Sequence, residues 1–271
     1  MLWIGGGQGV GKTTLSWRLS RANDLPLHQV DLWAYDHQAR MPAGDSLDEQ
    51  LARGAEAAAD AFESHSRLRL ELVLDDMSAR DLGTVPAIVE GPQLMPGFAA
   101  QLPPGWCVWL LPDPARTGIV REERLANQET LAGRPVASRS RAALVSQRDA
   151  ILTSRIREGA VLAGRPVIEV PPVPDWTAIA AAIESALAPA LAAAPRLSPG
   201  RELSRQRRYE NKTAARQGRL WTRDAGLTVL PAYPFGCECG KAGCRATWTA
   251  TPDDYEARTA SEPRLIAHAA S

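Results

Sequence analysis

The stretch that decides the fold lies near the N-terminus and reads Gly5-Gly6-Gly7-Gln8-Gly9-Val10-Gly11-Lys12-Thr13-Thr14. Within it, Gly6, Gly11, Lys12 and Thr13 fall at the spacing of the phosphate-binding pattern G-x-x-x-x-G-K-[ST]. The apolar run 1–4 precedes this stretch, and a helical pattern follows it. The sequence therefore predicts a loop that joins a buried strand to a helix.

The residue types in this loop suit a bound nucleotide such as ATP. Glycines let the backbone fold around a phosphate, and the helix that follows directs its positive end at the anion. We expect Lys12 to reach the β- and γ-phosphates and the hydroxyl of Thr13 to hold Mg²⁺. The predicted nucleotide-binding residues are Gly6, Gly7, Gln8, Gly9, Val10, Gly11, Lys12, Thr13 and Thr14. The alternative is a glycine-rich turn that binds no ligand.

Composition narrows the class of protein. The chain has 271 residues, and its 31 Lys and Arg balance 31 Asp and Glu, so no overall charge indicates nucleic acid or membrane. No secretory leader pattern is present at the start. The most apolar stretch, 179–194, is interrupted by Glu184 and Pro189 and is not expected to cross a membrane. These features predict a cytoplasmic protein.

Strand and helix patterns alternate through the first 192 residues. Four further strands are predicted at 25–30, 85–91, 106–111 and 165–170. Helices are predicted at 45–80, 140–160 and 176–191. Such alternation is typical of an α/β domain with a parallel sheet, here of five strands in three layers. The domain is expected to span 1–192, and 193–271 to hold a linker, a basic helix and a small cysteine-rich module.

Acidic residues stand where two of these strands end, and ligands of parallel sheets lie beyond that edge. Asp31 is a candidate catalytic and substrate-binding residue that accepts the proton of a hydroxyl substrate. Glu90 is a candidate that orients Mg²⁺ through water or contacts substrate. Arg40 is a candidate substrate contact that can share a helical face with Asp36. The alternatives are a polar loop with a surface ion pair for Asp31 and Arg40, and a turn-capping carboxylate for Glu90.

An arginine-rich stretch lies between the fourth and fifth strands. Its arginines are Arg116, Arg121, Arg124, Arg134, Arg139, Arg141 and Arg148. Such a segment suits a lid that closes over a nucleotide and stabilises the charge of a transferring group. Arg121 and Arg124 lie three positions apart, on one helical face, and are the catalytic candidates. The alternative is an arginine-rich surface helix.

Three of the four cysteines cluster near the C-terminus as Cys237, Cys239 and Cys244. Thiolates at this spacing can hold Zn²⁺ in a structural site, with His268 as the candidate fourth ligand. The alternative is three reduced thiols in a small core. The preceding basic helix at 201–223 is compatible with nucleic-acid binding, but a solvated helix is favoured and nucleic acid is not the expected partner.

The first half resembles the small-molecule P-loop kinases, a group of P-loop NTPases that includes nucleoside, nucleotide and shikimate-type kinases. The resemblance rests on the phosphate loop, Asp31, Glu90-Gly91 and the arginines of 116–148. The stretch Val89-Glu-Gly-Pro-Gln-Leu-Met-Pro96 is similar to one in a family of uncharacterised bacterial ATP-binding proteins. These resemblances imply a kinase-like nucleotide-binding core, with substrate-side roles for Asp31 and Arg40.

The second half is similar to a short C-terminal module found in the same setting. That module carries an asparagine near a helix start, a Cys-Glu-Cys…Cys turn, a Thr…Glu-Tyr segment and a terminal histidine. Here these features correspond to Asn211, 237–244, 251–256 and His268. The segment around His268 lacks the usual Phe and the final Gly-His.

The sequence therefore favours an ATP- and Mg²⁺-dependent phosphotransferase that acts on a hydroxyl of a small molecule. A second hypothesis is a regulatory ATPase whose zinc module contacts a protein partner. A third and weaker hypothesis is a nucleic-acid-binding C-terminal module.

Overall fold

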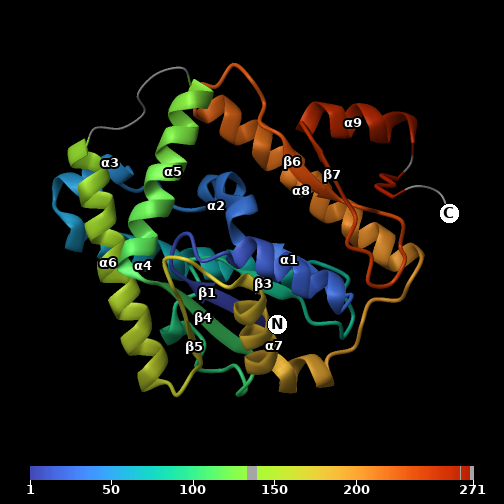
Figure 1. Ribbon diagram of the computed structural model, residues 1–271, viewed down its shortest axis with the longest axis horizontal. Coiled ribbons are helices and arrows are strands. Elements are labelled where there is room, and N and C mark those ends of the chain that lie inside the picture. Colours follow the sequence, from blue (N-terminus) through green and yellow to red (C-terminus); the bar gives the residue numbers. More distant parts are fainter. Residues whose placement is uncertain (133–138, 263, 269–271) are drawn as a thin grey trace.

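The computed structural model describes residues 1–132, 139–262 and 264–268. Its centre is a parallel sheet of five strands in the order β2-β3-β1-β4-β5 (Figure 1). The strands are β1 (Leu2–Gly6), β2 (Leu27–Gln29), β3 (Ile88–Glu90), β4 (Cys107–Pro112) and β5 (Val167–Val170). The expected five-stranded α/β fold is confirmed, and β1 is the central strand that carries the phosphate loop.

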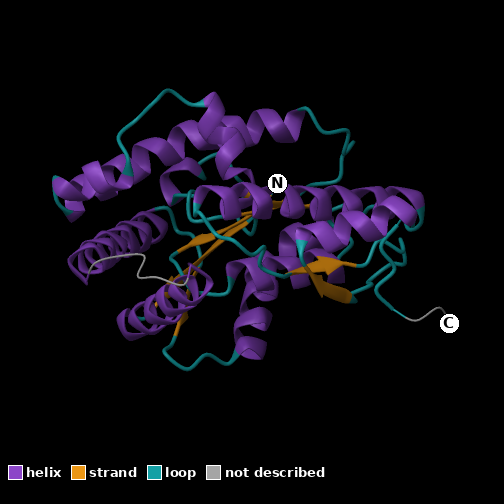
Figure 2. Ribbon diagram, turned by 90° about the horizontal axis from the view of Figure 1, so that it is seen from above, coloured by secondary structure: helices purple, strands orange, loops and turns teal. Residues whose placement is uncertain are grey.

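Successive apolar side chains along each strand lie on opposite faces of the sheet, so both faces are apolar. A layer of helices therefore covers each face. Leu2 and Ile4 of β1 pack with α1 (Lys12–Ala22) and α7 (Trp176–Ala193) on one face. Trp3 packs on the other face, where α4 (Ala55–Ser78) and α6 (Arg139–Leu162) lie. Figure 2 shows this three-layer arrangement from above.

The expected helix at 45–80 is two helices in the structure. The first is α3 (Leu47–Ala52), and Ser46 and Glu49 form a capping box at its start. It ends before Gly54, whose φ of 104° is incompatible with a helix, and α4 begins at Ala55. The remaining helices of this half are α2 (Ala34–Arg40), α5 (Pro114–Ala132) and two short 3₁₀ turns at Val30–Trp33 and Pro96–Phe98.

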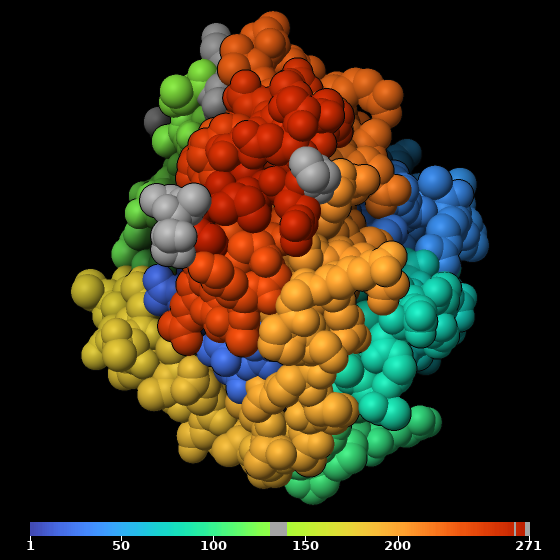
Figure 3. All heavy atoms as spheres, turned by 90° about the vertical axis from the view of Figure 1, so that its right-hand side faces the viewer, coloured from blue at the N-terminus to red at the C-terminus, as the bar shows by residue number. Residues whose placement is uncertain are grey.

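The C-terminal segment starts with α8 (Arg201–Asp224), which confirms the expected basic helix. An antiparallel pair, β6 (Tyr233–Gly236) and β7 (Thr247–Ala250), and the helix α9 (Pro252–Ser261) follow it. The pair and α9 enclose a small core in which Phe235 and Tyr255 stack at 4.4 Å. In Figure 3 these orange and red segments form a large part of one face of the molecule. The division at 192/193 stays a prediction.

Buried charges hold α8 against the first half. Arg21 at the end of α1 pairs with Glu210 of α8 at 3.0 Å, and only 2% of the Arg21 side chain is exposed. Arg207 of α8 donates to the hydroxyl of Ser20 at 2.9 Å and lies 3.3 Å from Glu210. Glu210 also accepts from the backbone N–H of Leu27. One carboxylate therefore compensates two buried arginines and ties α8 to β2.

Among the described helices, α7 is the one that by length and composition alone is apolar enough to span a membrane. By length and composition, therefore, Glu184 and Pro189 within this helix do not exclude a membrane-spanning segment, contrary to the expectation from the sequence. In the structure, however, Ile179, Ile183 and Leu187 of α7 are buried against the sheet. Such packing is typical of a core helix. The cytoplasmic location stays a prediction.

Candidate nucleotide site and cysteine cluster

The phosphate loop lies between β1 and α1, as the sequence predicts. Gly6 and Gly11 have positive φ angles of 120° and 75°, which favour glycine. A Cβ atom on Gly6 would lie 1.9 Å from the carbonyl oxygen of Leu110 on β4. The close approach of β1 to β4 therefore requires this glycine. The loop leads directly into α1, whose first residue is Lys12, so free N–H groups of the first turn border the loop.

Lys12 lies across the loop rather than in solvent. Its side chain is 8% exposed, and Nζ donates to the carbonyl oxygen of Gly7 at 2.6 Å. Burial lowers the pKa of its ammonium group, and the nearby Glu90 and Asp31 oppose this shift. The cation is thus held at the place where a phosphate enters the loop.

Glu90 lies beside Thr13 because β3 is the direct neighbour of β1 in the sheet. The hydroxyl of Thr13 donates to Oε1 of Glu90 at 3.1 Å, and Gln29 Nε2 donates to the same oxygen at 3.3 Å. Burial raises the pKa of Glu90 to about 7. A hydroxyl and a carboxylate on adjacent elements are the pair that holds Mg²⁺ in phosphate loops of this type. The donor set therefore fits a magnesium ion.

Asp31 stands at the end of β2, in the 3₁₀ turn that follows it, and is exposed. Its Oδ1 accepts from Gln93 Nε2 at 3.0 Å. Asp31, Glu90 and the loop residues from Gln8 to Thr14 line one cavity of about 300 Å³. The structure thus brings these candidates together at the carboxyl edge of the sheet, where ligands of such sheets bind.

The two predicted catalytic arginines occupy different places. Arg124 of α5 donates to Oε1 of Gln8 at 2.9 Å and lines the cavity of the phosphate loop. Arg121 pairs with Asp149 of α6 and lines a second cavity of about 840 Å³ between α3, α5 and α6. Gln8, Val120 and Arg124 border both cavities, which are therefore neighbours.

The other arginines of this stretch are spread over its two helices. Arg116 lines the phosphate-loop cavity, whereas Arg141 and Arg148 line the larger one. Arg134 lies outside the described residues, and so does the side chain of Arg139.

Arg40 does not line either cavity. Its Nη1 donates to Asp76 of α4 at 2.5 Å, and Nε2 of His37 lies 2.9 Å from the other oxygen of the same carboxylate. The pairing of Asp36 with Arg40 that their spacing allows is not formed, because Asp36 pairs with Arg216 of α8. The substrate role of Arg40 stays a prediction.

Gln93 and Trp176 contribute to the candidate nucleotide site but are not among the residues predicted from the sequence, and Arg116 is predicted only as one arginine of the lid segment. Gln93 fixes the carboxylate of Asp31. Arg116 donates to the carbonyl oxygen of Gly9 at 3.3 Å, and its guanidinium lies 5.3 Å from the ring centre of Trp176. Trp176 begins α7 and lines the same cavity. An isolated Trp or Gln after a strand carries no sequence pattern, so only the fold reveals them.

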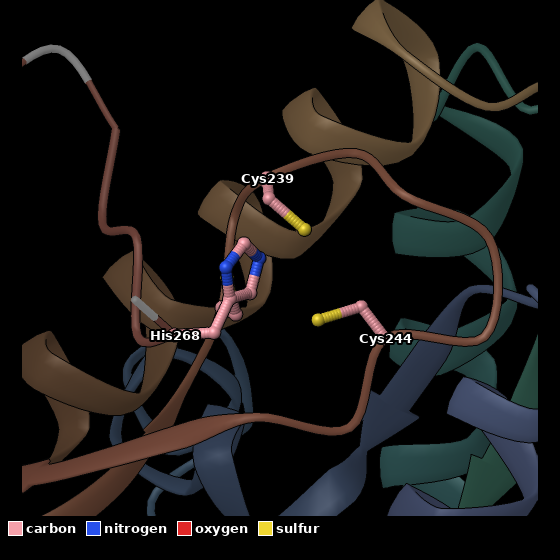
Figure 4. Close-up of side chains that lie close together, drawn as sticks. Cys239, Cys244 and His268 are labelled. Carbon is pink, nitrogen blue, oxygen red and sulfur yellow. The ribbon is translucent and has the colours of Figure 1, made fainter. Parts of the chain in front are cut away.

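The cysteine cluster gathers residues from both ends of the C-terminal segment. Ligand atoms of Cys237, Cys239, Cys244 and His268 lie within 4.8 Å of one another. Figure 4 shows Cys239, Cys244 and His268 pointing toward one another. A tetrahedral zinc with Zn–S bonds of about 2.3 Å holds its sulfurs roughly 3.8 Å apart. The donor set and its spacing therefore fit a structural zinc site.

Backbone donors surround the sulfurs. Cys237 Sγ accepts from the N–H of Ala267 at 3.3 Å, and Cys239 Sγ accepts from the N–H of Lys241 at 3.4 Å. Both N–H groups therefore point at sulfurs of the proposed metal site.

Glu238, between two of these cysteines, is a fully buried residue that sequence analysis did not identify. Its side chain accepts from Asn211 Nδ2 at 2.8 Å, from the hydroxyl of Tyr255 at 2.7 Å and from the N–H of Leu265 at 3.1 Å. These bonds join α8, α9 and the irregular segment at Leu265 around the cluster. Charged residues are rarely buried without such partners, so Glu238 has a structural role.

The cysteine loop also touches the end of the phosphate-loop helix. The backbone N–H of Gly243, next to Cys244, donates to Asp24 at 3.0 Å. Arg21 packs so closely on Gly236 that a Cβ there would lie 2.4 Å from its Nη2 atom. The cluster is therefore built against the far end of α1.

The strand order and the phosphate loop define the class: an α/β protein with the P-loop fold. No protein-family model matches the chain, and no curated protein matches it in sequence. Two solved structures are similar: a gluconokinase from Sinorhizobium meliloti 1021 and a shikimate kinase from Bacteroides thetaiotaomicron.

Both similarities are weak. The gluconokinase has a TM-score of 0.35 and 14% identity, covering 70% of this chain and 92% of its own. The shikimate kinase has a TM-score of 0.34 and 15% identity, covering 69% and 97%. Both are kinases by name.

Proposed function

We propose that the chain is an ATP- and Mg²⁺-dependent phosphotransferase that acts on a hydroxyl group of a small molecule. The observation that carries this proposal is one cavity that combines the phosphate loop, the Thr13–Glu90 pair and the carboxylate of Asp31. Phosphate loops bind nucleotides in many proteins, but a free carboxylate on the same cavity adds a group that can accept a proton. This combination supports transfer to an acceptor over nucleotide binding alone.

Each residue has a defined part in this proposal. Lys12 and the loop N–H groups bind the phosphates, while Thr13 and Glu90 hold the magnesium ion. Mg²⁺ supplies charge neutralisation at the phosphates when it is bound. Asp31 orients the acceptor hydroxyl and takes its proton, and Gln93 fixes the orientation of Asp31. Arg124, which reaches the loop through Gln8, stabilises charge on the transferring group.

The test is an assay of the purified protein with ATP, Mg²⁺ and a mixture of metabolites. The readouts are ADP formation and any new phosphorylated mass. We expect a phosphorylated product that is lost in Lys12→Ala. In Asp31→Asn we expect the product to be lost while ATP binding remains, because Asn keeps the shape but cannot accept the proton.

A regulatory ATPase is the second candidate. The contact of the cysteine loop with Asp24 and the packing of Gly236 on Arg21 favour it, because both link a possible metal site to the helix that follows the phosphate loop. In that case the C-terminal segment contacts a protein partner. Slow ATP hydrolysis that is insensitive to Asp31→Asn, without a phosphorylated product, supports this candidate over the kinase.

We also propose that the cysteine cluster holds one structural zinc ion. Its four donors leave no open position for a substrate, so the site stabilises the fold and does no chemistry itself. A module of this size has a small apolar core, and a metal ion adds stability that such a core lacks. Metal analysis of the purified protein is expected to give one zinc per chain.

A further inference from the structure

A continuous stripe of basic residues runs along α8. Its members follow one another at intervals of four or three residues, and at 3.6 residues per turn they fall within an arc of about 80°. They are Arg201, Arg205, Arg208, Lys212, Arg216, Arg219 and Arg223. The stripe covers 22 steps of the helix, or about 33 Å at 1.5 Å per residue.

The opposite face of α8 is buried, so the stripe is the outer face of the helix. Leu203, Arg207, Asn211 and Ala215 lie on the buried face. In contrast, Arg201, Arg205, Lys212, Arg216 and Arg223 are exposed. The fold thus places the basic residues of α8 on one face and its packing residues on the other. The net charge of zero for the whole chain does not reveal this local concentration of positive charge.

Some charges of the stripe are compensated and others are not. Arg216 pairs with Asp36, and Arg219 pairs with Asp253 and Glu256 of α9. Arg201, Arg205, Lys212 and Arg223 have no carboxylate within ion-pair distance among residues 1–132, 139–262 and 264–268. At least four positive charges of one helix face therefore point into solvent without a counter-ion from the described chain.

The chemistry of this face argues against a protein or membrane surface as its partner. Protein interfaces have an apolar and aromatic centre, yet none of the exposed large hydrophobic residues lies on α8. Membrane-bound amphipathic helices insert their apolar face, whereas the apolar face of α8 is packed against the protein. A stripe of about 33 Å with unpaired cations along one helix face fits a linear polyanion better.

We propose that the outer face of α8 binds nucleic acid along its phosphate backbone, independently of base sequence. Six of the seven residues are arginines, whose planar guanidinium groups match phosphate oxygens. At 3.4 Å per nucleotide, a stripe of 33 Å lies alongside about ten phosphates of one strand. The helices α2 and α9 contact α8 on its flanks and keep it from entering a groove of the nucleic acid. The stripe therefore contacts the phosphate backbone and not the base edges.

The test measures binding of the full chain to a fluorescein-labelled 20-nucleotide oligo-dT and to a 20-base-pair duplex by anisotropy, between 50 and 200 mM salt. The triple variant Arg201→Gln/Arg205→Gln/Lys212→Gln removes three unpaired charges. Binding to single-stranded DNA falls with salt by about 0.7 log units per phosphate contact, so the salt exponent should drop by about 2. We expect an affinity lower by roughly 100-fold or more at 50 mM salt.

A control triple, Arg18→Gln/Arg67→Gln/Arg264→Gln, removes the same charge from exposed positions elsewhere. We expect this control to bind the oligonucleotides as tightly as the unchanged protein does. Lys12→Ala should also bind them equally well, which would show that the stripe and not the phosphate loop binds nucleic acid. Three results overturn the proposal: no binding at 50 mM salt, equal losses in both triples, or competition by poly-glutamate as strong as by oligo-dT. The last would identify an acidic protein as the partner.

Discussion

The hydroxyl of Thr13 and the carboxylate of Glu90 lie 3.1 Å apart, although 77 positions separate them in the chain. The sheet order brings them together, since β3 pairs directly with β1. Neither residue alone indicates a metal site, because threonines and acidic residues at strand ends are common. Their contact at the end of a phosphate loop gives both a specific expected role at the magnesium ion.

Glu90→Gln should weaken the magnesium-dependent part of ATP binding. Gln keeps the hydrogen bond with Thr13 but carries no negative charge toward the ion. We expect ATP affinity without Mg²⁺ to change little, and the gain on adding Mg²⁺ to fall by about tenfold, equivalent to about 1.4 kcal/mol. Isothermal titration with and without Mg²⁺ measures both values. An equal loss in both conditions would place Glu90 outside the metal site.

The buried Glu90 should also make the ligand-free protein less stable at higher pH. Its pKa is raised to about 7, so the folded chain binds the proton more tightly than the unfolded chain does. The stabilisation is complete below the unfolded pKa of about 4.3 and is lost as pH rises through 7. Urea unfolding of the unchanged protein and of Glu90→Gln at pH 5 and pH 8 measures this. Between pH 5 and pH 8 we expect the free energy of unfolding of Glu90→Gln to rise by roughly 3 kcal/mol relative to that of the unchanged protein.

Glu210→Ala should be strongly destabilising, because it leaves Arg21 buried without its counter-charge and leaves Arg207 with the weaker pairing to Asp24 at 4.0 Å. Breaking a buried pair in this way costs about 3–5 kcal/mol. The matched control is Glu169→Ala, which removes an exposed partner of Arg157 and should cost less than about 1 kcal/mol. Urea denaturation of both variants compares them. Similar small losses would show that α8 is not held by this charge.

Cys244→Ser should lower zinc content and Tm together, because a structural metal binds the folded chain and not the unfolded one. Cys107→Ala is the control, since Cys107 is the remaining cysteine and lies in the core strand β4. It should lower Tm through lost packing and leave zinc content unchanged. Zinc content that is the same in both variants contradicts the metal site.

The fold could be predicted from the sequence because its signals are local. The loop pattern, five apolar runs and the helical spacing each depend on neighbouring residues. The strands β2 and β3 are shorter than expected, since Pro26 and Pro86 lack the N–H of a sheet ladder and Val30 begins a 3₁₀ turn. The split of 45–80 at Gly54 depends on a backbone angle that the helical periodicity does not reveal.

The candidate site was predictable only where residue type and motif coincide. Lys12, Thr13 and Glu90 follow from the loop and a strand end, and the fold places them together. The partners of Arg40 and Arg121, Asp76 and Asp149, lie 36 and 28 positions away, and no local pattern links them. Gln93 and Glu238 act through long-range hydrogen bonds, which also leave no trace in the sequence.

The charge that Glu210 provides to Arg21 also limits how such a chain can evolve. A gene fragment that ends in the linker before α8 would encode a half in which Arg21 lacks both its counter-charge and the residues of α8 and β6 that cover it. Fusing that half to a different C-terminal segment would leave the same defect unless the newcomer carried an acid at the same point. We therefore expect the two halves to be inherited as one unit and to unfold in a single cooperative step, rather than to be exchanged as separate modules.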